Sequence, residues 1–185
     1  MKLVKFLREN KTIALSFVIV ALSFILLAIP KSFAHLGVEH VNPNTYHYYL
    51  SGYEWMFGTV KNALDKAIGS AVPAGIAALS LLALSFVGLC FSKKSSFVAL
   101  LTSLALITVA ILFFASGAAT AKAYPDLYQI AENGEFSNMY WAPYVIASLT
   151  LIAGGLMMYR TILVMKDEVK RPTQSKGPSY NYLHK

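Results

Sequence analysis

The sequence contains a single cysteine, Cys90, so no disulfide can form within the chain. A thiol oxidoreductase needs two thiols that exchange with a disulfide, and this class of enzyme is therefore excluded. Cys90 lies at the end of a long apolar run, where two interpretations stay open. It is either a small apolar side chain that fills space at a helix end, which we expect, or a site of S-palmitoylation.

Charged residues are also scarce, at 14% of the 185 residues, whereas about a quarter is usual in a soluble domain. The shortage is concentrated in four apolar runs that contain no Asp, Glu, Lys or His. Each run approaches or exceeds the roughly 20 helical residues that cross a bilayer. None alternates with a period of two, which argues against a β-barrel. We predict an all-α membrane protein, a four-transmembrane-helix bundle forming a single membrane domain over residues 1–185, with spans at about 13–29, 74–91, 97–119 and 143–164.

The placement of the basic residues predicts the orientation of these spans. Lys and Arg outnumber Asp and Glu by 16 to 9, which gives a net charge of +7. The surplus lies before the first run, at 93–94 between the second and third, and around and after the end of the fourth. Because cytoplasmic segments are enriched in Lys and Arg, we predict cytoplasmic termini, a cytoplasmic tail at 165–185 and outer loops at 31–73 and 120–142. The basic surplus then indicates topology and attraction to anionic lipid, and we predict no binding of nucleic acid.

The first run has an alternative interpretation, because Ser32-Phe33-Ala34 resembles a signal-peptide cleavage site. Signal peptides have an apolar stretch of about 7–15 residues, and this run is longer. We therefore expect it to remain a membrane span, with cleavage after Ala34 as the alternative.

The extramembrane segments carry a few local signals. Pro30 is expected to end the first helix, and Asn42-Pro43-Asn44 predicts a turn or irregular loop. Apolar residues near helical spacing predict an amphipathic helix at 59–71, and Pro125-Asp126 predicts a short helix at 126–132.

Between the spans, small and hydroxyl residues should form the contact seams, among them Thr102, Ser103, Thr150, Gly154 and Gly155.

The spans lack the groups that several functions require. Ion-coupled transporters usually place ionisable side chains at membrane depth, and haem-binding quinone cytochromes need histidines on their helices. A hydroxyl-lined transport path stays open, and convergence of Ser16, Ser23, Thr102 and Thr108 on a hydrated cavity would favour it. No phosphate loop, serine elbow or His-Glu-x-x-His motif is present. We therefore predict no enzyme activity, no catalytic residue and no cofactor.

Three histidines of the first outer loop, His35, His40 and His47, are the candidate metal ligands. Imidazole binds zinc and copper, and three ligands would leave an open position. Their spacing matches no known ligand motif, so we interpret them as solvated or headgroup-level histidines and predict no metal site. Convergence of the three rings would reverse this interpretation.

Positions 46–57 of the first outer loop are unusually aromatic, because six of these twelve residues are Phe, Tyr or Trp. Tyr and Trp join an apolar body to a polar tip, which suits a membrane interface or a partner surface. The alternative is a lid packed on the protein's own helices, and the two interpretations are compatible. The predicted contact residues for a partner or lipid are Tyr46, Tyr48, Tyr49, Gly52, Tyr53, Trp55 and Phe57.

The same run carries a resemblance. Tyr49, Ser51-Gly52-Tyr53 and Phe57-Gly58, placed after a first span, look similar to a group of small four-span membrane proteins of low-GC bacteria. That resemblance implies a bacterial plasma membrane and no particular activity. The layout also resembles claudins in topology only, because the paired loop cysteines and the Trp-Gly-Leu-Trp signature of claudins are absent.

The function predicted from these features is that of a non-enzymatic integral membrane accessory, scaffold or interaction protein, a subunit of a larger membrane assembly. Its predicted partners are the lipid bilayer and a membrane protein or a second copy of the chain. A small transporter or channel subunit is the alternative, and a metal-binding site in the outer loop is the third hypothesis.

Overall fold

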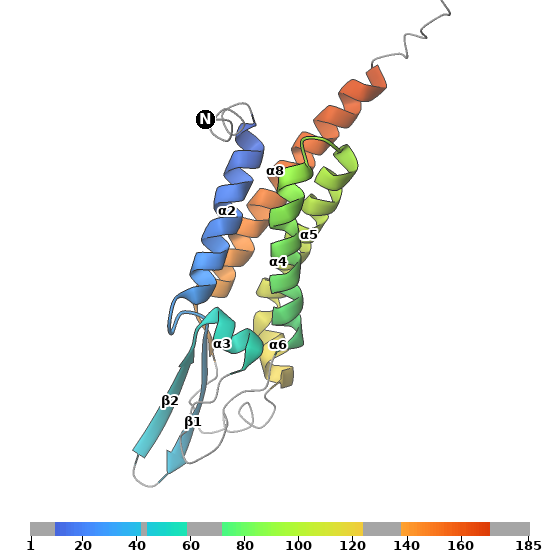
Figure 1. The fold of residues 1–185 in the computed structure, drawn as a ribbon. Coiled ribbons are helices and arrows are strands. Elements are labelled where there is room, and N and C mark those ends of the chain that lie inside the picture. Colours follow the sequence, from blue (N-terminus) through green and yellow to red (C-terminus); the bar gives the residue numbers. More distant parts are fainter. Residues whose placement is uncertain (1–9, 42–43, 59–71, 124–137, 171–185) are drawn as a thin grey trace, which may run out of the picture.

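The computed structural model describes residues 10–41, 44–58, 72–123 and 138–170, with side chains at 10–35, 49–58, 72–120 and 139–166 (Figure 1). Four of its helices are long and apolar enough to cross a membrane. They are α2 (Lys11–Ala28), α4 (Pro73–Phe91), α5 (Ser96–Phe114) and α8 (Trp141–Lys170). The prediction of four membrane-spanning helices is confirmed at this level.

The helices form a bundle in which each one contacts two others. α5 packs most extensively against α8 and next against α4, while α2 contacts α8 and α4. The two contacts of α5 rest on small residues: a side chain at Gly88 would collide with the Thr102 hydroxyl, and the Ser103 hydroxyl donates a hydrogen bond to the Gly154 carbonyl at 3.1 Å. Such close approach is how helices associate in lipid, where burial of apolar surface gives no driving force. The predicted seam residues Thr102, Ser103 and Gly154 are confirmed, whereas the prediction for Gly155 is wrong, because Gly155 is exposed and a Cβ there would meet no atom within 4 Å.

The third predicted span ends earlier than expected. Instead of continuing to residue 119, α5 stops at Phe114, and a separate helix, α6 (Ser116–Ala123), follows after Ala115. Ala115 has φ −83° and ψ 5°, and its N–H donates to the Ile111 and Phe113 carbonyls. The break precedes a Ser-Gly pair, a sequence at which helices commonly kink.

Between α2 and α4 the chain forms strands, which the expectation of an all-α protein did not include. Residues 42 and 43, where a turn or irregular loop is predicted, fall outside the described residues. Strands β1 (Ala34–Val41) and β2 (Asn44–Leu50) pair antiparallel, and β3 (Asn138–Met139) pairs with the start of β1, giving the order β2-β1-β3. A bulge lies between Leu36 and Val38. β1 contains two Val residues, and β2 contains one Thr and three Tyr. These residue types favour a pleated strand.

A short helix, α3 (Gly52–Phe57), follows the hairpin and was also not predicted. It begins with a capping box: the Ser51 side chain accepts from the Glu54 N–H, and the Glu54 carboxylate accepts from the Ser51 N–H at 2.8 Å. This reciprocal pairing satisfies two backbone donors at the helix start. We call residues 32–41, 44–58 and 138–140 the cap, because they lie together at one end of the bundle (Figure 1). The predicted helices at 59–71 and 126–132 fall outside the described residues.

Candidate interaction site

The centre of the cap is the indole of Trp55, which is 1% exposed. Its ring centroid lies 4.9 Å from that of Phe33, which in turn lies 5.9 Å from the Phe113 ring on α5. The indole Nε1 donates to the Thr120 hydroxyl at 2.8 Å, and Thr120 donates to the Ser116 carbonyl at 2.7 Å. Trp55 is thus held in place by packing against Phe33, which contacts α5, and by a hydrogen bond to α6.

Two glycines let the cap lie directly on the helix ends. A Cβ at Gly75, in the first turn of α4, would lie 2.5 Å from the Trp55 ring. A Cβ at Gly52 would lie 2.6 Å from the Leu27 side chain and 3.0 Å from the Leu27 Cα, at the end of α2. Neither position has room for a larger residue, because protein interiors are packed too densely to absorb such contacts without a shift.

Backbone hydrogen bonds join the cap to the helices that enter it. The Val72 N–H donates to the Met56 carbonyl at 3.0 Å just before α4 begins. At the start of α8, the Tyr140 N–H donates to the Phe33 carbonyl at 3.0 Å and the Ala142 N–H to the Ser32 carbonyl at 3.3 Å. Together with the buried Trp55, these bonds make the cap a continuation of the bundle.

A second aromatic group lies on the sheet. The rings of His35, Tyr49 and Tyr140 are stacked, with centroids 4.8 Å apart for His35 and Tyr49 and 6.0 Å for Tyr49 and Tyr140. All three side chains are half-buried, and the Lys31 ammonium lies 5.8 Å from the Tyr49 ring centroid, within reach of a cation–π interaction. Burial raises the pKa of the Tyr140 phenol, and the electrostatic interaction and hydrogen bond with the neighbouring Tyr49 raise it further.

The predicted contact residues divide into interior and accessible ones. Trp55 and Gly52 are buried inside the protein, which agrees with the alternative of a lid packed on its own bundle. Tyr49 and Tyr53 are half-buried, and Phe57 is 56% exposed. Tyr46 and Tyr48 belong to β2, and their side chains lie outside the described part of the chain.

Sequence reasoning did not single out several residues that shape this site. The sequence indicates Phe33 only as part of a possible cleavage site, although its ring lies between those of Trp55 and Phe113. Thr120 supplies the acceptor for the buried indole N–H. A buried tryptophan usually needs a hydrogen-bond partner for its indole N–H. The presence of Trp55 in a loop next to apolar helix ends is therefore the one sequence signal that an acceptor such as Thr120 exists.

The histidines are placed by the hairpin. His35 pairs with Tyr49, His40 with Thr45, and His47 with Val38 in the strand register. Among the side chains that the structure describes, no group of three His, Cys, Asp or Glu residues lies close enough to hold a metal ion. The side chains of His40 and His47 fall outside that set, so the convergence of all three rings is not tested.

Four hydroxyl groups would have to converge to form a transport path. Each of them instead forms a hydrogen bond within its own helix. Ser16, Ser23, Thr102 and Thr108 each donate to the carbonyl four residues earlier, at 2.8 to 3.0 Å. Thr108 is exposed on the outside of the bundle, whereas Thr102 is buried against α4 at Gly88. The four groups therefore do not line one common cavity.

The fold thus defines a bundle of four potential membrane spans with a packed cap at one end. Comparison of the sequence with models of known protein families gives no match, and comparison with curated proteins also gives none. The resemblance to small four-span bacterial membrane proteins therefore stays a prediction.

Proposed function

We propose that this chain is a non-enzymatic accessory or interaction protein of a bacterial plasma membrane, which binds a membrane-protein partner or a second copy of itself through its cap. The observation that carries the proposal is the division of α3 into two faces. Trp55 and Met56 are buried on one side, while Phe57, the next residue, is 56% exposed. α3 is held in place by one face and offers a large apolar side chain on the other.

The rigid attachment of the cap supports a contact role. Binding costs less when the contact surface is already ordered, because fewer side chains and loops lose freedom on association. The accessible aromatic residues Tyr49, Tyr53 and Phe57 stand on elements joined to the bundle by buried packing and backbone hydrogen bonds. Aromatic side chains of this kind often contribute most of the energy of an interface.

Phe57→Ala is expected to weaken association with the partner by about 1–2 kcal/mol while leaving the protein folded. The measurement is quantitative mass spectrometry of proteins recovered with the full chain from mild detergent, normalised to folded protein, followed by reconstitution with the recovered partner. Tyr159→Ala is the matched control, because Tyr159 is a 64% exposed aromatic residue on α8 outside the cap.

Wild-type recovery and self-association in a variant that combines Phe57→Ala with Tyr49→Ala would contradict the proposal. Equal losses in the Tyr159→Ala control would also contradict it, because the effect would then belong to exposed aromatic residues in general. Thermal unfolding of each variant separates a lost contact from a lost fold.

The proposed orientation, with the cap outside and both termini cytoplasmic, has its own test. In a Cys90→Ala background, a membrane-impermeant thiol reagent added to intact cells should label Asn44→Cys or Asn133→Cys. It should spare Ser95→Cys and Ser175→Cys until the cells are permeabilised. The physical reason is the placement of basic residues at the end that holds Ser95, and labelling of the second pair in intact cells would reverse the topology.

A further inference from the structure

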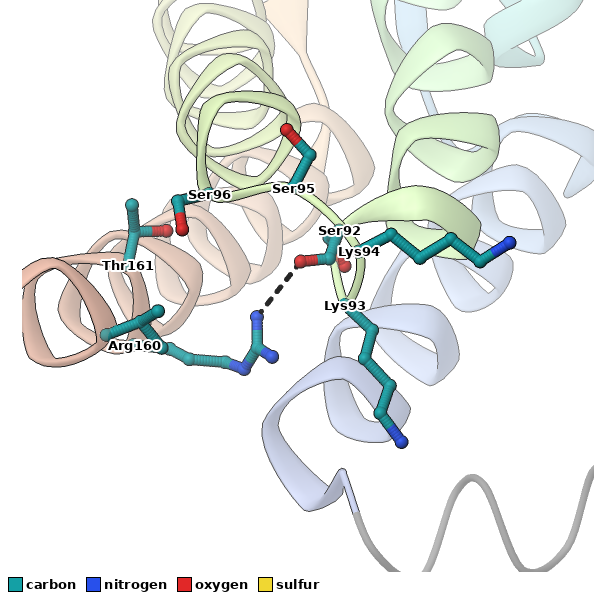
Figure 2. Close-up of a pocket in the computed structure, with 8 residues that line it drawn as sticks. Ser92, Lys93, Lys94, Ser95, Ser96, Arg160 and Thr161 are labelled. Carbon is teal, nitrogen blue, oxygen red and sulfur yellow. Dashed lines mark hydrogen bonds between the residues drawn. The ribbon is translucent and has the colours of Figure 1, made fainter. Parts of the chain in front are cut away.

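A polar pocket lies at the end of the bundle away from the cap, between the turn that joins α4 to α5 and the side of α8 (Figure 2). Its volume is about 90 Å³. Three of its eight lining residues, Lys93, Lys94 and Arg160, are positively charged, and none is acidic. Four more carry hydroxyl groups, and Val164 provides an apolar wall. A pocket with this lining favours an anion.

The guanidinium of Arg160 is the fixed part of the pocket. It is half-buried, and its Nη1 donates to the Ser92 carbonyl at 3.3 Å, so it bridges α8 and the turn (Figure 2). A guanidinium has five N–H donors in a planar fork, and the Ser92 bond uses one of them. No described carboxylate pairs with Arg160. Its charge and its remaining donors match the two oxygens of a phosphate group, which arginine binds in a bidentate manner.

The start of α5 adds to the positive potential. Ser95 is the N-cap of this helix, and its side chain accepts from the Val98 N–H at 3.4 Å. The N-terminal end of a helix carries a partial positive charge that favours phosphate. Lys93 and Lys94 are exposed on long flexible stems, and Figure 2 shows both directed away from Arg160. Their ammonium groups would contribute long-range attraction, and Arg160 the direct contact.

We propose that this pocket binds the phosphate group of an anionic phospholipid. The pocket lies where the candidate span Pro73–Phe91 ends and the candidate span Ser96–Phe114 begins, so lipid headgroups would surround it. Phe97, next to the lining residue Ser96, is 68% exposed, and its ring would contact the upper part of an acyl chain. Basic pockets between membrane helices are a known way to bind anionic headgroups. The proposal concerns the opposite end from the cap and does not depend on the proposed function.

The test uses the full chain in a neutral detergent. Phosphatidylglycerol should raise the thermal unfolding midpoint and appear as a retained lipid in native mass spectrometry, whereas phosphatidylcholine should do neither. Arg160→Gln should weaken phosphatidylglycerol binding at least about tenfold, the effect of losing one strong charge-assisted hydrogen bond. Lys166→Gln is the matched control, because it removes the same charge from an exposed position on the same helix without touching the pocket lining.

Unchanged phosphatidylglycerol affinity in Arg160→Gln would overturn the proposal, and so would an equal loss in Lys166→Gln. If inorganic phosphate alone protects the protein as well as the lipid does, with the same dependence on Arg160, the ligand is a soluble anion and the lipid assignment fails. Should Arg160→Gln not fold, the exposed pair Lys93→Gln and Lys94→Gln replaces it. That double variant should bind the lipid several-fold more weakly, and wild-type affinity would count against the pocket.

Discussion

Trp55→Ala is expected to lower the free energy of unfolding by about 3–5 kcal/mol, the usual cost of removing a large buried aromatic side chain. The indole is 1% exposed and contacts Phe33 and the first turn of α4 at Gly75. Removing it would leave a cavity between the cap and helices α4 and α6. Thermal or denaturant unfolding in detergent micelles measures the change.

Two further variants separate the contribution of the indole hydrogen bond from that of an exposed aromatic side chain on the same helix. Thr120→Val keeps the side-chain shape but leaves the indole N–H without its acceptor, which should cost about 1–3 kcal/mol. Phe57→Ala, in the same helix as Trp55 but 56% exposed, should change stability by no more than about 0.5 kcal/mol. If Trp55→Ala unfolds like the wild type and instead loses its partner, Trp55 is a contact residue and is not buried against Phe33 and Gly75.

The four helices long and apolar enough to cross a membrane were predictable because each is formed by one continuous segment. A run of apolar residues without charge has few alternatives to a membrane helix, since its backbone must be satisfied internally. Helix ends were less predictable: α8 continues to Lys170, beyond the expected end at 164, and α5 stops at Phe114. Ends depend on local backbone geometry, such as that of Ala115, which hydropathy does not register.

The strands were not predicted, because Asn42-Pro43-Asn44 by itself indicates only a turn or loop, and the residues on either side are what indicate strands. Segment 34–41 contains two Val, segment 44–50 contains one Thr and three Tyr, and the two flank a turn signal, which is the sequence pattern of a β-hairpin. The bulge between Leu36 and Val38 interrupts a simple alternation. The capping box at Ser51 and Glu54 was also visible in the sequence as a Ser-x-x-Glu motif.

The role of Trp55 could be stated only as two alternatives, because its partners are far away in the sequence. Thr120 lies 65 positions later, and Phe33 and Gly75 come from either side of the run. No periodicity connects these positions. The aromatic run was correctly identified as unusual, but which of its members face inward depends on how α3 lies across the helix ends.

The second large effect is expected at the seam between α5 and α8. A Cβ at Gly154 would lie 2.8 Å from the Ile107 side chain and 3.2 Å from both the Ile107 nitrogen and the Ser103 carbonyl oxygen. Two of these three contacts are backbone atoms, which cannot turn aside as a side chain can. Gly154→Val should therefore force the helices apart, at a cost of about 1–3 kcal/mol for overpacking. It should also break the hydrogen bond from Ser103 to the Gly154 carbonyl, for about 1 kcal/mol more.

The neighbouring glycine provides the control for this prediction. Gly155 is exposed, and a Cβ there would meet no atom within 4 Å. Gly155→Val adds the same β-branched side chain to the same turn of α8, so differences in helix propensity between glycine and valine affect both variants alike. The difference between the two unfolding free energies then isolates the interhelical contact, because only residue 154 faces α5. Equal stability of the two variants would show that α5 and α8 do not approach as closely as described, and the packing of the whole bundle would need revision.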